Sequence, residues 1–449
     1  MEFYFALPKS DSIKKFLLWT FFLGNIVTIF VLWWARSNYY IENPADGNML
    51  IALGRLSGLL AEFFILVQLV MVGRMRFIEK LYGFDKLNIF HRYIGYSILL
   101  LMVPHPILLT IGNATANGVP FLSQFADYLA NTENVLLAFF ALGLFIFVIF
   151  ISITIVRKKL RYETWYFTHL VTYLAIGLAL GHQLGTGDLR DSWGLTYWYI
   201  INFGVFGFLL LYRFLRPLYL FYKYRFVVED IIAENTDTYS LYISGRNLES
   251  FKFDAGQYAN ITLLARGMWY THPFSFSAAQ NGKFIRFSIK SLGDYTTQIR
   301  NISPGTHLLI DGPLGRFTGK HSTREKTLFI AGGIGITPLR AMMESLARDQ
   351  KDMILLYGAR SLQDVVFTQE FDYLKRLCPT IAVQYIFSTP TEGYESGYLD
   401  KEKLVRLVPD FYSREVFLCG PPPMMNAAVK NLKELGFSDD HLHFEKFSF

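Results

Sequence analysis

Long apolar runs occupy the first half of the chain and are absent from the second. A helix that spans a membrane needs ~20 consecutive residues of mainly apolar character. Six segments reach or approach that length, at residues 16–34, 49–72, 93–111, 135–156, 165–180 and 193–211. The fifth is short, and the sixth is rich in aromatic residues. The pattern predicts a bundle of six transmembrane helices.

The lysines and arginines that border these runs predict their orientation. Twelve of them lie in the N-terminal segment and in the connections after the second and fourth runs, whereas two, Arg36 and Arg190, lie on the opposite side. Connections rich in Lys and Arg stay in the cytoplasm. The N-terminus and everything after the sixth helix are therefore predicted to be cytoplasmic. The first run is too long for the apolar core of a signal peptide and is expected to be retained.

The second half changes its pattern once more. Short segments of alternating polarity, such as TYSLYISG and FIRFSIK, lie between residues 217 and 322 and predict a small antiparallel β-barrel. From about residue 323, apolar runs such as TLFIAGG and EVFLCGP end in glycine and precede helix-compatible sequence, which is typical of a parallel α/β sheet. The chain is thus predicted to be a multidomain membrane protein with domains at residues 1–216, 217–322 and 323–449.

The composition disfavours several classes of function. The net charge is +6, but many basic residues border apolar runs, so the charge indicates membrane topology and no nucleic-acid partner is expected. The two cysteines, Cys378 and Cys419, both lie in the soluble half and form no CxxC motif. Iron–sulfur clusters, zinc fingers and a disulfide framework are therefore disfavoured.

Four of the nine histidines lie in the apolar half and are regularly spaced. His91 and His105 flank the third run, 14 residues apart, and His169 and His182 flank the fifth, 13 residues apart. Such spacings are nearly four helical turns, so both histidines of a helix lie on roughly one face, ~20 Å apart. Because the third and fifth helices run in the same direction, His91 is expected to pair with His169 near the cytoplasm. His105 is then expected to pair with His182 near the far side.

The predicted pairs suit haem. A haem iron takes two axial ligands, and imidazole is among its usual ligands. A lone histidine in a membrane helix is more often a hydrogen-bonding group that faces the bundle interior. Four with matched spacings favour two stacked haems. On the second helix, Arg55 is expected to bind a propionate of the outer haem or to attract the electron acceptor, the alternative being an ion pair with Glu62.

Two glycine-rich turns follow predicted strands. In AGGIGITP, at residues 331–338, three glycines allow a pyrophosphate to approach the backbone, and the following helix supplies N–H groups. The motif departs from GxGxxG at Thr337 and Pro338, and proline suits the first turn of a helix. In FLCGPPPMM, Cys419 and Gly420 end another strand and are expected to face the same crevice. Cys419 has the alternative role of a small buried apolar residue.

Three further features favour nucleotide and flavin binding. Arg360 and Ser361, in LYGARS, suit the 2′-phosphate of NADPH and favour it over NADH, although an ordinary surface arginine is the alternative. Phe274, in THPFSFSA, can stack on a flat ring, although aromatic residues on strands are more often core residues. The turn from Gly293 to Thr297 opens a short helix whose N–H groups can bind a pyrophosphate.

In this order, the elements resemble the ferric reductase and NADPH oxidase superfamily, in its prokaryotic form without regulatory domains. The resemblance covers nearly the whole chain and implies a six-helix di-haem domain, a ferredoxin–NADP reductase-like FAD barrel and a Rossmann-like α/β nucleotide domain. It implies axial haem ligands at His91, His105, His169 and His182. The implied FAD residues are His272, Pro273, Phe274, Ser275, Lys290, Gly293, Thr296 and Thr297. The implied nucleotide residues are Gly332, Gly333, Gly335, Thr337, Pro338, Arg360, Ser361, Cys419, Gly420 and Pro421.

The resemblance also implies a function. NADPH or NADH would reduce FAD, and two b-type haems would pass the electrons across a bacterial inner or plasma membrane. The terminal Phe449 would cover the flavin until the nicotinamide displaces it. Three acceptors stay open: O2 near Arg55 to give superoxide, a ferric or cupric chelate, or a periplasmic partner enzyme. The connection at 113–134 has no Lys or Arg, which leans towards O2 over anionic ferric chelates.

Overall fold

The computed structural model describes residues 9–444 except 74, 154–155, 157–158, 161, 186–188 and 190–192. The chain forms two compact units. The helical unit comprises Lys9–Met75 and Lys86–Arg213, and the dehydrogenase unit comprises Arg76–Asp85 and the residues from Phe214 onwards. Arg190, which the topology prediction used, lies outside the described residues.

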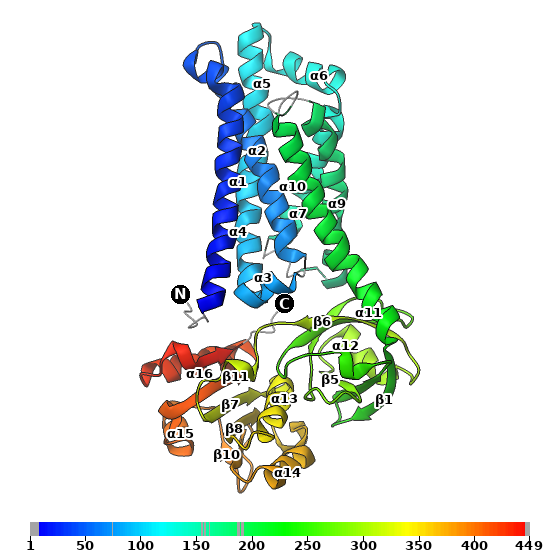
Figure 1. Cartoon of the computed structure of the whole chain (residues 1–449), viewed down its shortest axis with the longest axis vertical. Helices are drawn as coiled ribbons and strands as arrows, with labels where there is room; N and C mark the ends of the chain where they lie inside the picture. The colour runs from blue at the N-terminus through cyan, green and yellow to red at the C-terminus, as the bar shows by residue number, and fades with distance from the viewer. Residues whose placement is uncertain are drawn as a thin grey trace. The chain divides into compact units, whose positions relative to one another are not determined.

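The helical unit is a bundle of mainly long helices. They are α1 (Lys9–Glu42), α2 (Asn48–Val72), α4 (Phe84–Met102), α5 (Pro104–Asn117), α6 (Phe121–Asn131), α7 (Val135–Ser152), α9 (Tyr162–Gly185) and α10 (Trp193–Leu209). α2 packs against α1, α5 and α10, and α7 packs against α9. The short α6 joins α5 to α7 and lies across the bundle axis (Figure 1).

The surface of this bundle is apolar. On α7 the rings of Phe139, Phe140, Phe147 and Phe150 are all exposed. A soluble protein rarely exposes such a continuous apolar face, whereas a helix in lipid does so by necessity. Five helical stretches of the described residues are long and apolar enough to cross a membrane: Asp11–Glu42, Asn48–Val72, Lys86–Asn117, Val135–Ser152 and Trp193–Tyr224. The protein is therefore a membrane protein.

Two helices differ from the predicted pattern. The third run is longer than residues 93–111 and forms α4 and α5, which meet at Val103. Pro104 has no amide hydrogen and its ring clashes with the preceding turn, so one regular helix cannot continue through it. α9 has 24 residues but is not among the five apolar stretches. It nevertheless buries Ala175 and Ile176 in the bundle core.

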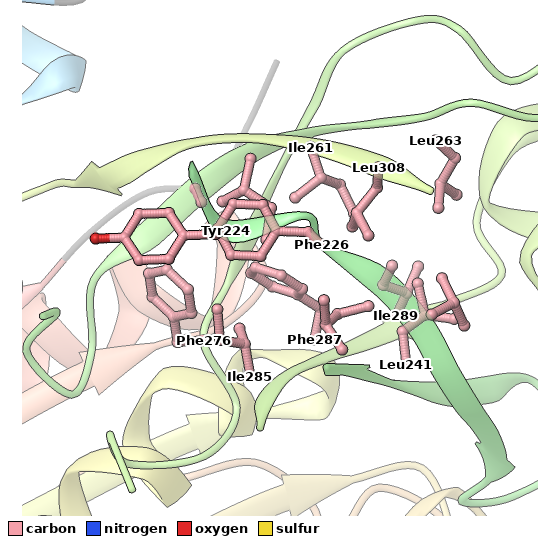
Figure 2. Packing of buried hydrophobic residues seen from close by; sticks show 14 of the residues in the cluster. Tyr224, Phe226, Leu241, Ile261, Leu263, Phe276, Ile285, Phe287, Ile289 and Leu308 are labelled. Carbon is pink, nitrogen blue, oxygen red and sulfur yellow. The ribbon is translucent and has the colours of Figure 1, made fainter. Parts of the chain in front are cut away.

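The first part of the dehydrogenase unit consists of two three-stranded antiparallel sheets, in the orders β1-β2-β5 and β4-β3-β6. The strands are β1 (Val227–Ala233), β2 (Thr238–Ser244), β3 (Tyr258–Leu263), β4 (His272–Ser275), β5 (Ile285–Lys290) and β6 (Leu308–Leu314). Alternate side chains of both sheets, Leu241, Ile261 and Phe287 among them, meet in one apolar core (Figure 2). Helix α11 (Arg216–Tyr224) adds Leu220 and Tyr224 to that core. The antiparallel architecture is as the alternation predicts.

The second part is a six-stranded parallel sheet in the order β10-β9-β8-β7-β11-β12. The strands are β7 (Lys326–Gly332), β8 (Asp352–Ala359), β9 (Ile381–Phe387), β10 (Glu395–Ser396), β11 (Arg414–Cys419) and β12 (Leu442–Phe444). Helices α13 (Ile336–Ala347) and α14 (Thr368–Leu377) cover one face, and α15 (Lys401–Leu407) and α16 (Pro422–Glu434) cover the other. The predicted parallel α/β sheet is confirmed, and its adjacent strands β7 and β11 end in the two glycine-rich turns.

A short helix between two membrane helices belongs to the dehydrogenase unit. α3 (Arg76–Tyr82) packs against β6. Its buried Glu79 accepts hydrogen bonds from the Tyr258 hydroxyl at 2.7 Å and the Gly315 amide at 2.9 Å. Arg76 donates to the carbonyl oxygen of Gly312. In the sequence, this segment is recognisable only as a basic connection.

Candidate functional site

The structure brings the four membrane histidines together in two pairs. The ring centroids of His91 on α4 and His169 on α9 are 6.1 Å apart. Those of His105 on α5 and His182 on α9 are 6.4 Å apart. These are the two pairs that the spacing predicts.

Both separations fit two imidazoles that share one metal ion. Bonds from imidazole to a transition metal are ~2 Å long, and a ring nitrogen lies ~1.1 Å from the ring centre, so ligands on opposite sides of a metal have centroids ~6 Å apart. Direct packing of two rings would allow a wider range of separations. The donor set, two neutral imidazoles and no thiolate or carboxylate, suits a bis-histidine haem iron better than zinc.

Hydrogen bonds orient three of the four rings. The Nδ1 atom of His105 lies 2.7 Å from the Gly54 carbonyl oxygen, and that of His182 lies 2.5 Å from the Ala179 carbonyl oxygen. A carbonyl oxygen can only accept, so both Nδ1 atoms carry the proton and both Nε2 atoms keep a lone pair for a metal. Nδ1 of His169 lies 3.2 Å from the hydroxyl oxygen of Ser152, which gives its own proton to Val148.

His91 differs from the other three histidines. Its Nδ1 atom is buried and has no hydrogen-bond partner among the described residues. An unpartnered nitrogen in an apolar bundle costs free energy, and only a partner at Nδ1 itself would offset that cost. Neither Ser152 nor the carbonyl groups of Gly54 and Ala179 could be identified from the sequence, because partners of this kind have no signature in it.

Close packing between α2 and α5 also shapes the outer pair. A Cβ atom built on Gly58 would lie 2.6 Å from the ring of His105. Such a separation does not occur between real Cβ atoms and their neighbours, so the residue at position 58 must lack a side chain for this ring to stay in place. Gly58 is thus a site residue that no sequence motif indicates.

The two charged residues of α2 have separate surroundings. Arg55 donates to the Tyr40 hydroxyl at 3.4 Å and lies over the Tyr40 ring, 4.7 Å from its centroid. Glu62 is buried and accepts from the amide of Gln183 at 3.1 Å. Gln183, the neighbour of His182, also accepts from the indole N–H of Trp198 at 2.9 Å. Glu62 therefore belongs to a polar network beside the outer pair.

In the dehydrogenase unit, β4 contains the HPFS motif and pairs with β3. Phe274 packs partly against the apolar core, and the His272 ring stacks on Tyr295 with centroids 3.9 Å apart. Thr296 accepts from the amides of Leu292 and Gly293, at 2.9 and 3.0 Å, and thereby fixes the turn that opens α12 (Asp294–Thr297). This turn leaves the first amides of α12 for an anion. Lys290 forms an ion pair with Asp237 at 3.1 Å.

The two glycine-rich turns of the sheet pack against each other. A Cβ atom on Gly335 would lie 2.4 Å from the carbonyl oxygen of Cys419, and one on Gly332 would lie 2.2 Å from the sulfur of Met424. Only glycine permits this approach. Thr337 donates to the Ile334 carbonyl oxygen at 3.0 Å in the first turn of α13, where Pro338 follows it.

The structure shows the surroundings of three predicted nucleotide residues, Cys419, Arg360 and Ser361. Cys419 is 1% exposed and packs in the apolar cluster below the turns, as its alternative role requires. Arg360 is exposed, as a residue for a 2′-phosphate must be. Ser361, however, donates its amide and hydroxyl to the carboxylate of Asp364, at 3.1 and 2.7 Å. The Arg360 side chain would attract a 2′-phosphate and therefore favours NADPH. The Asp364 carboxylate would repel a 2′-phosphate and therefore favours NADH.

The predicted Phe449 lies outside the described residues. The described part of the chain ends on β12. Phe444 on β12 pairs with Leu418, one residue before Cys419, and β12 runs parallel to β11. β12 therefore ends at the edge of the sheet that carries both glycine-rich turns.

Three family models match successive parts of the chain. The ferric reductase like transmembrane component matches residues 57–180, the FAD-binding domain matches residues 224–318, and the oxidoreductase NAD-binding domain matches residues 329–430. The first match includes His91, His105 and His169, and His182 lies two residues beyond it.

Curated relatives are similar to about half of the chain. The reductase subunit of glycine betaine monooxygenase from Chromohalobacter salexigens is 27% identical over 48% of this chain and 62% of its own. The NADPH oxidoreductase of Mycobacterium tuberculosis is 28% identical over 52% and 62%. The chain thus spans about three-fifths of the length of these relatives. Among solved structures, the FAD/NAD-binding domain of nitric oxide dioxygenase from Vibrio cholerae is 25% identical, with a TM-score of 0.44, over 49% of this chain and 97% of that one.

Proposed function

Because the chain belongs to the ferric reductase and NADPH oxidase superfamily, we propose that it carries electrons across a bacterial inner or plasma membrane, from NAD(P)H through FAD and two b-type haems. The observation that carries this proposal is the pair of histidine separations, 6.1 and 6.4 Å, each of which fits one bis-imidazole iron. Two such sites in one bundle indicate an electron path through lipid.

His91 and His169 would hold the inner haem, and His105 and His182 the outer one. A haem bound in this way supplies a one-electron carrier inside a layer that excludes ions. The carbonyl groups of Gly54 and Ala179 keep the ligating nitrogen of each outer histidine unprotonated. We assign α9 as a sixth membrane span, since it carries two of the four proposed ligands and packs Ala175 and Ile176 into the bundle core. Its histidines and other polar residues explain its lower hydropathy.

The dehydrogenase unit would bind the donor. FAD would lie on β4 and the turn before α12, where Phe274 and Ser275 face the flavin and amides from Gly293 onwards hold the pyrophosphate. NAD(P)H would lie across the turns at Gly333–Gly335 and Cys419–Pro421, the carboxyl ends of adjacent parallel strands. Flavin accepts a hydride and releases electrons singly, which haem iron requires. We propose that Phe449 covers the flavin until the nicotinamide arrives.

The position of α3 supports the predicted sidedness. α3 connects two membrane helices, and it packs within the dehydrogenase unit through Glu79 and Arg76. The connection between the second and third spans must therefore lie on the same side of the membrane as that unit. Since the basic residues place this connection in the cytoplasm, NAD(P)H would be oxidised there.

We propose that O2 is the acceptor. It would be reduced to superoxide beside the outer histidine pair, near Arg55, as the resemblance to the superfamily implies. The Arg55 guanidinium lies over the Tyr40 ring, and the described connection through α6 contains no Lys or Arg to attract an anionic ferric chelate. A ferric or cupric metalloreductase is the second candidate, and electron donation to a periplasmic enzyme is the third.

One experiment tests both the path and the acceptor. The purified full-length protein should show b-type bands from about two haems per chain in reduced-minus-oxidised spectra. NADPH should then reduce cytochrome c, and superoxide dismutase should abolish that reduction if O2 is the acceptor. A rate that depends on ferric citrate and ignores dismutase would identify a metalloreductase. Absence of haem would refute the proposed path.

A further inference from the structure

A buried group of four charged side chains joins the two halves of the dehydrogenase unit. Arg286 lies on β5, Arg340 and Glu344 on α13, and Glu370 on α14. Their side chains are 3%, 9%, 21% and 27% exposed, respectively. Two positive and two negative charges balance, and each side chain contacts one of the opposite sign. The function proposed above uses none of them.

Glu370 is the centre of this network. Its two carboxylate oxygens accept from the two terminal nitrogens of Arg286, at 2.6 and 3.1 Å, and Nε of Arg340 lies 2.5 Å from one of them. A forked pair of this kind fixes the relative orientation of both groups. Burial raises the pKa of Glu370, but the hydrogen bonds from Arg286 and the charge of Arg340 outweigh it and hold that pKa below the ordinary value. Glu370 is therefore ionised at neutral pH.

The network holds the chain that directly follows the flavin strand. The Ser277 carbonyl oxygen accepts from Arg286 at 2.7 Å and from Arg340 at 3.3 Å. The Ala279 amide donates to the carboxylate of Glu344 at 2.8 Å, and Arg340 pairs with the same carboxylate. Ser277 and Ala279 come two and four residues after the end of β4. The position of the HPFS strand is thus tied to side chains of α13.

The other end of the network leads to the nucleotide turn. Arg340 lies on the second turn of α13, and the first turn of that helix follows Gly333–Gly335 directly. A helix is a stiff element, so fixing Arg340 also fixes the turn in front of it. The network therefore sets the separation between the strand assigned to FAD and the turn assigned to NAD(P)H.

We propose that Arg286, Arg340, Glu344 and Glu370 are positioning residues for hydride transfer. The inference rests on the NAD(P)H-to-FAD step of the proposed function. In that step the C4–H bond of the dihydronicotinamide breaks, and the hydrogen moves with both electrons to flavin N5. The products are NAD(P)⁺ and the reduced flavin anion. Reacting atoms must approach to about 3–3.5 Å, and a displacement of ~1 Å can cost ~100-fold in rate.

A role in stability alone would explain the network less well. Replacing a buried ion pair with apolar residues of similar volume is often neutral or stabilising, because the charges must lose their hydration. An apolar contact in the same place would, however, lack the directional bonds to Ser277 and Ala279. Directional bonds between two ligand-binding elements are what a reaction with a strict approach distance requires.

The test uses Glu370→Gln in the purified full-length protein, mixed rapidly with NADPH without oxygen. Flavin reduction should slow by ~10–100-fold, while the NADPH concentration at half-saturation and the FAD content stay unchanged. The isotope effect with 4-deuterated NADPH should rise, because hydride transfer then limits the rate. Hydrogen exchange at the Ala279 amide should quicken. Glu395→Gln is the matched control: it breaks an exposed forked pair with Arg406, at 2.7 and 2.8 Å, and should change none of these readouts.

Two gentler variants keep the proposal testable if Glu370→Gln does not fold. Arg340→Lys keeps the charge but has a single nitrogen for the partners that Nη1 and Nε of Arg340 contact, and Glu344→Gln keeps an acceptor for the Ala279 amide. Both should give rates between those of Glu370→Gln and the wild type. Wild-type rates in both, or a rate loss that merely follows loss of FAD, would overturn the proposal. If NAD(P)H does not reduce the wild-type flavin, the proposed function fails first and this inference fails with it.

Discussion

At the scale of single residues, the four membrane histidines make the sharpest prediction. His105→Leu should remove about one of two haems, because its partner His182 cannot supply both axial ligands. His182→Leu should remove the same haem. The double variant should therefore lose no more haem than either single variant, whereas His91→Leu with His105→Leu should lose both. NADPH should still reduce FAD in every variant.

Haem per polypeptide, measured from the b-type bands and the protein concentration, checks this prediction. The two double variants serve as controls for each other. Losses of haem add when the two changes lie at independent sites, and they do not add when both changes lie at one site. Equal haem content in His105→Leu and the wild type would refute the ligand assignment. Additive loss in His105→Leu with His182→Leu would refute the pairing.

The residues of the candidate site differ in how far the sequence could reveal them. Histidine spacing along helices predicted the two pairs, because helical geometry fixes which side chains share a face. It could not reveal Gly58, whose role depends on how closely α2 approaches α5. Nor could it reveal that Glu62 bonds to Gln183, because three-dimensional packing decides between that partner and Arg55. A pattern along the sequence cannot reveal side chains that act through contacts between helices.

At the scale of elements, the approach of α2 to α5 is the feature most open to test. Gly58→Ala would place a methyl group against the His105 ring, and overpacking of this kind typically costs about 1–3 kcal/mol. The ring must shift, so the outer haem should bind less fully while the inner haem stays. Gly143→Ala on α7 is the matched control, since nothing lies within 4 Å of a Cβ atom at that glycine.

Haem content and the midpoint of thermal unfolding measure the outcome. Gly58→Ala should lower the haem content, and Gly143→Ala should leave the haem content and the unfolding midpoint unchanged. If Gly58→Ala retains two haems with unaltered spectra, the close packing seen at His105 is not what holds its ring.

The elements themselves were predicted best where one periodicity dominates. Alternating segments gave antiparallel strands, and apolar runs that end in glycine gave the parallel sheet, since burial on one or both faces imposes those patterns. Pro104 divides the third run into α4 and α5, a break that hydropathy averages over. α3 has seven residues, RFIEKLY, too few for a periodic signal, and its helical form depends on packing against β6.

At the scale of the whole molecule, α3 belongs to the dehydrogenase unit and lies next in sequence to α4, the helix that carries His91. Glu79 on α3 binds the Tyr258 hydroxyl and the Gly315 amide, and Tyr258 pairs with Ser275 of the flavin strand. α4, which carries His91, follows α3 after a single residue. One buried carboxylate thus attaches the strand proposed to bind FAD to the short helix that precedes α4.

Glu79→Ala should therefore separate the two stages of electron transfer. The change leaves the buried Gly315 amide without its acceptor, which costs about 1–3 kcal/mol and should release α3 from β6. Flavin reduction by NADPH should keep its wild-type rate, because hydride transfer does not involve α3. Haem reduction should slow, because electron transfer depends on a fixed path from flavin to haem. Rapid mixing without oxygen resolves the two steps, by flavin bleaching and by the haem bands.

The control is Asp254→Ala, which removes an exposed ion pair with Lys320 in the same unit. Exposed pairs contribute about 0–1 kcal/mol, so this variant should behave as the wild type in both stages. If Glu79→Ala slows flavin reduction as much as haem reduction, α3 supports the dehydrogenase fold in general. If it slows neither, the attachment of α3 to β6 has no part in electron transfer.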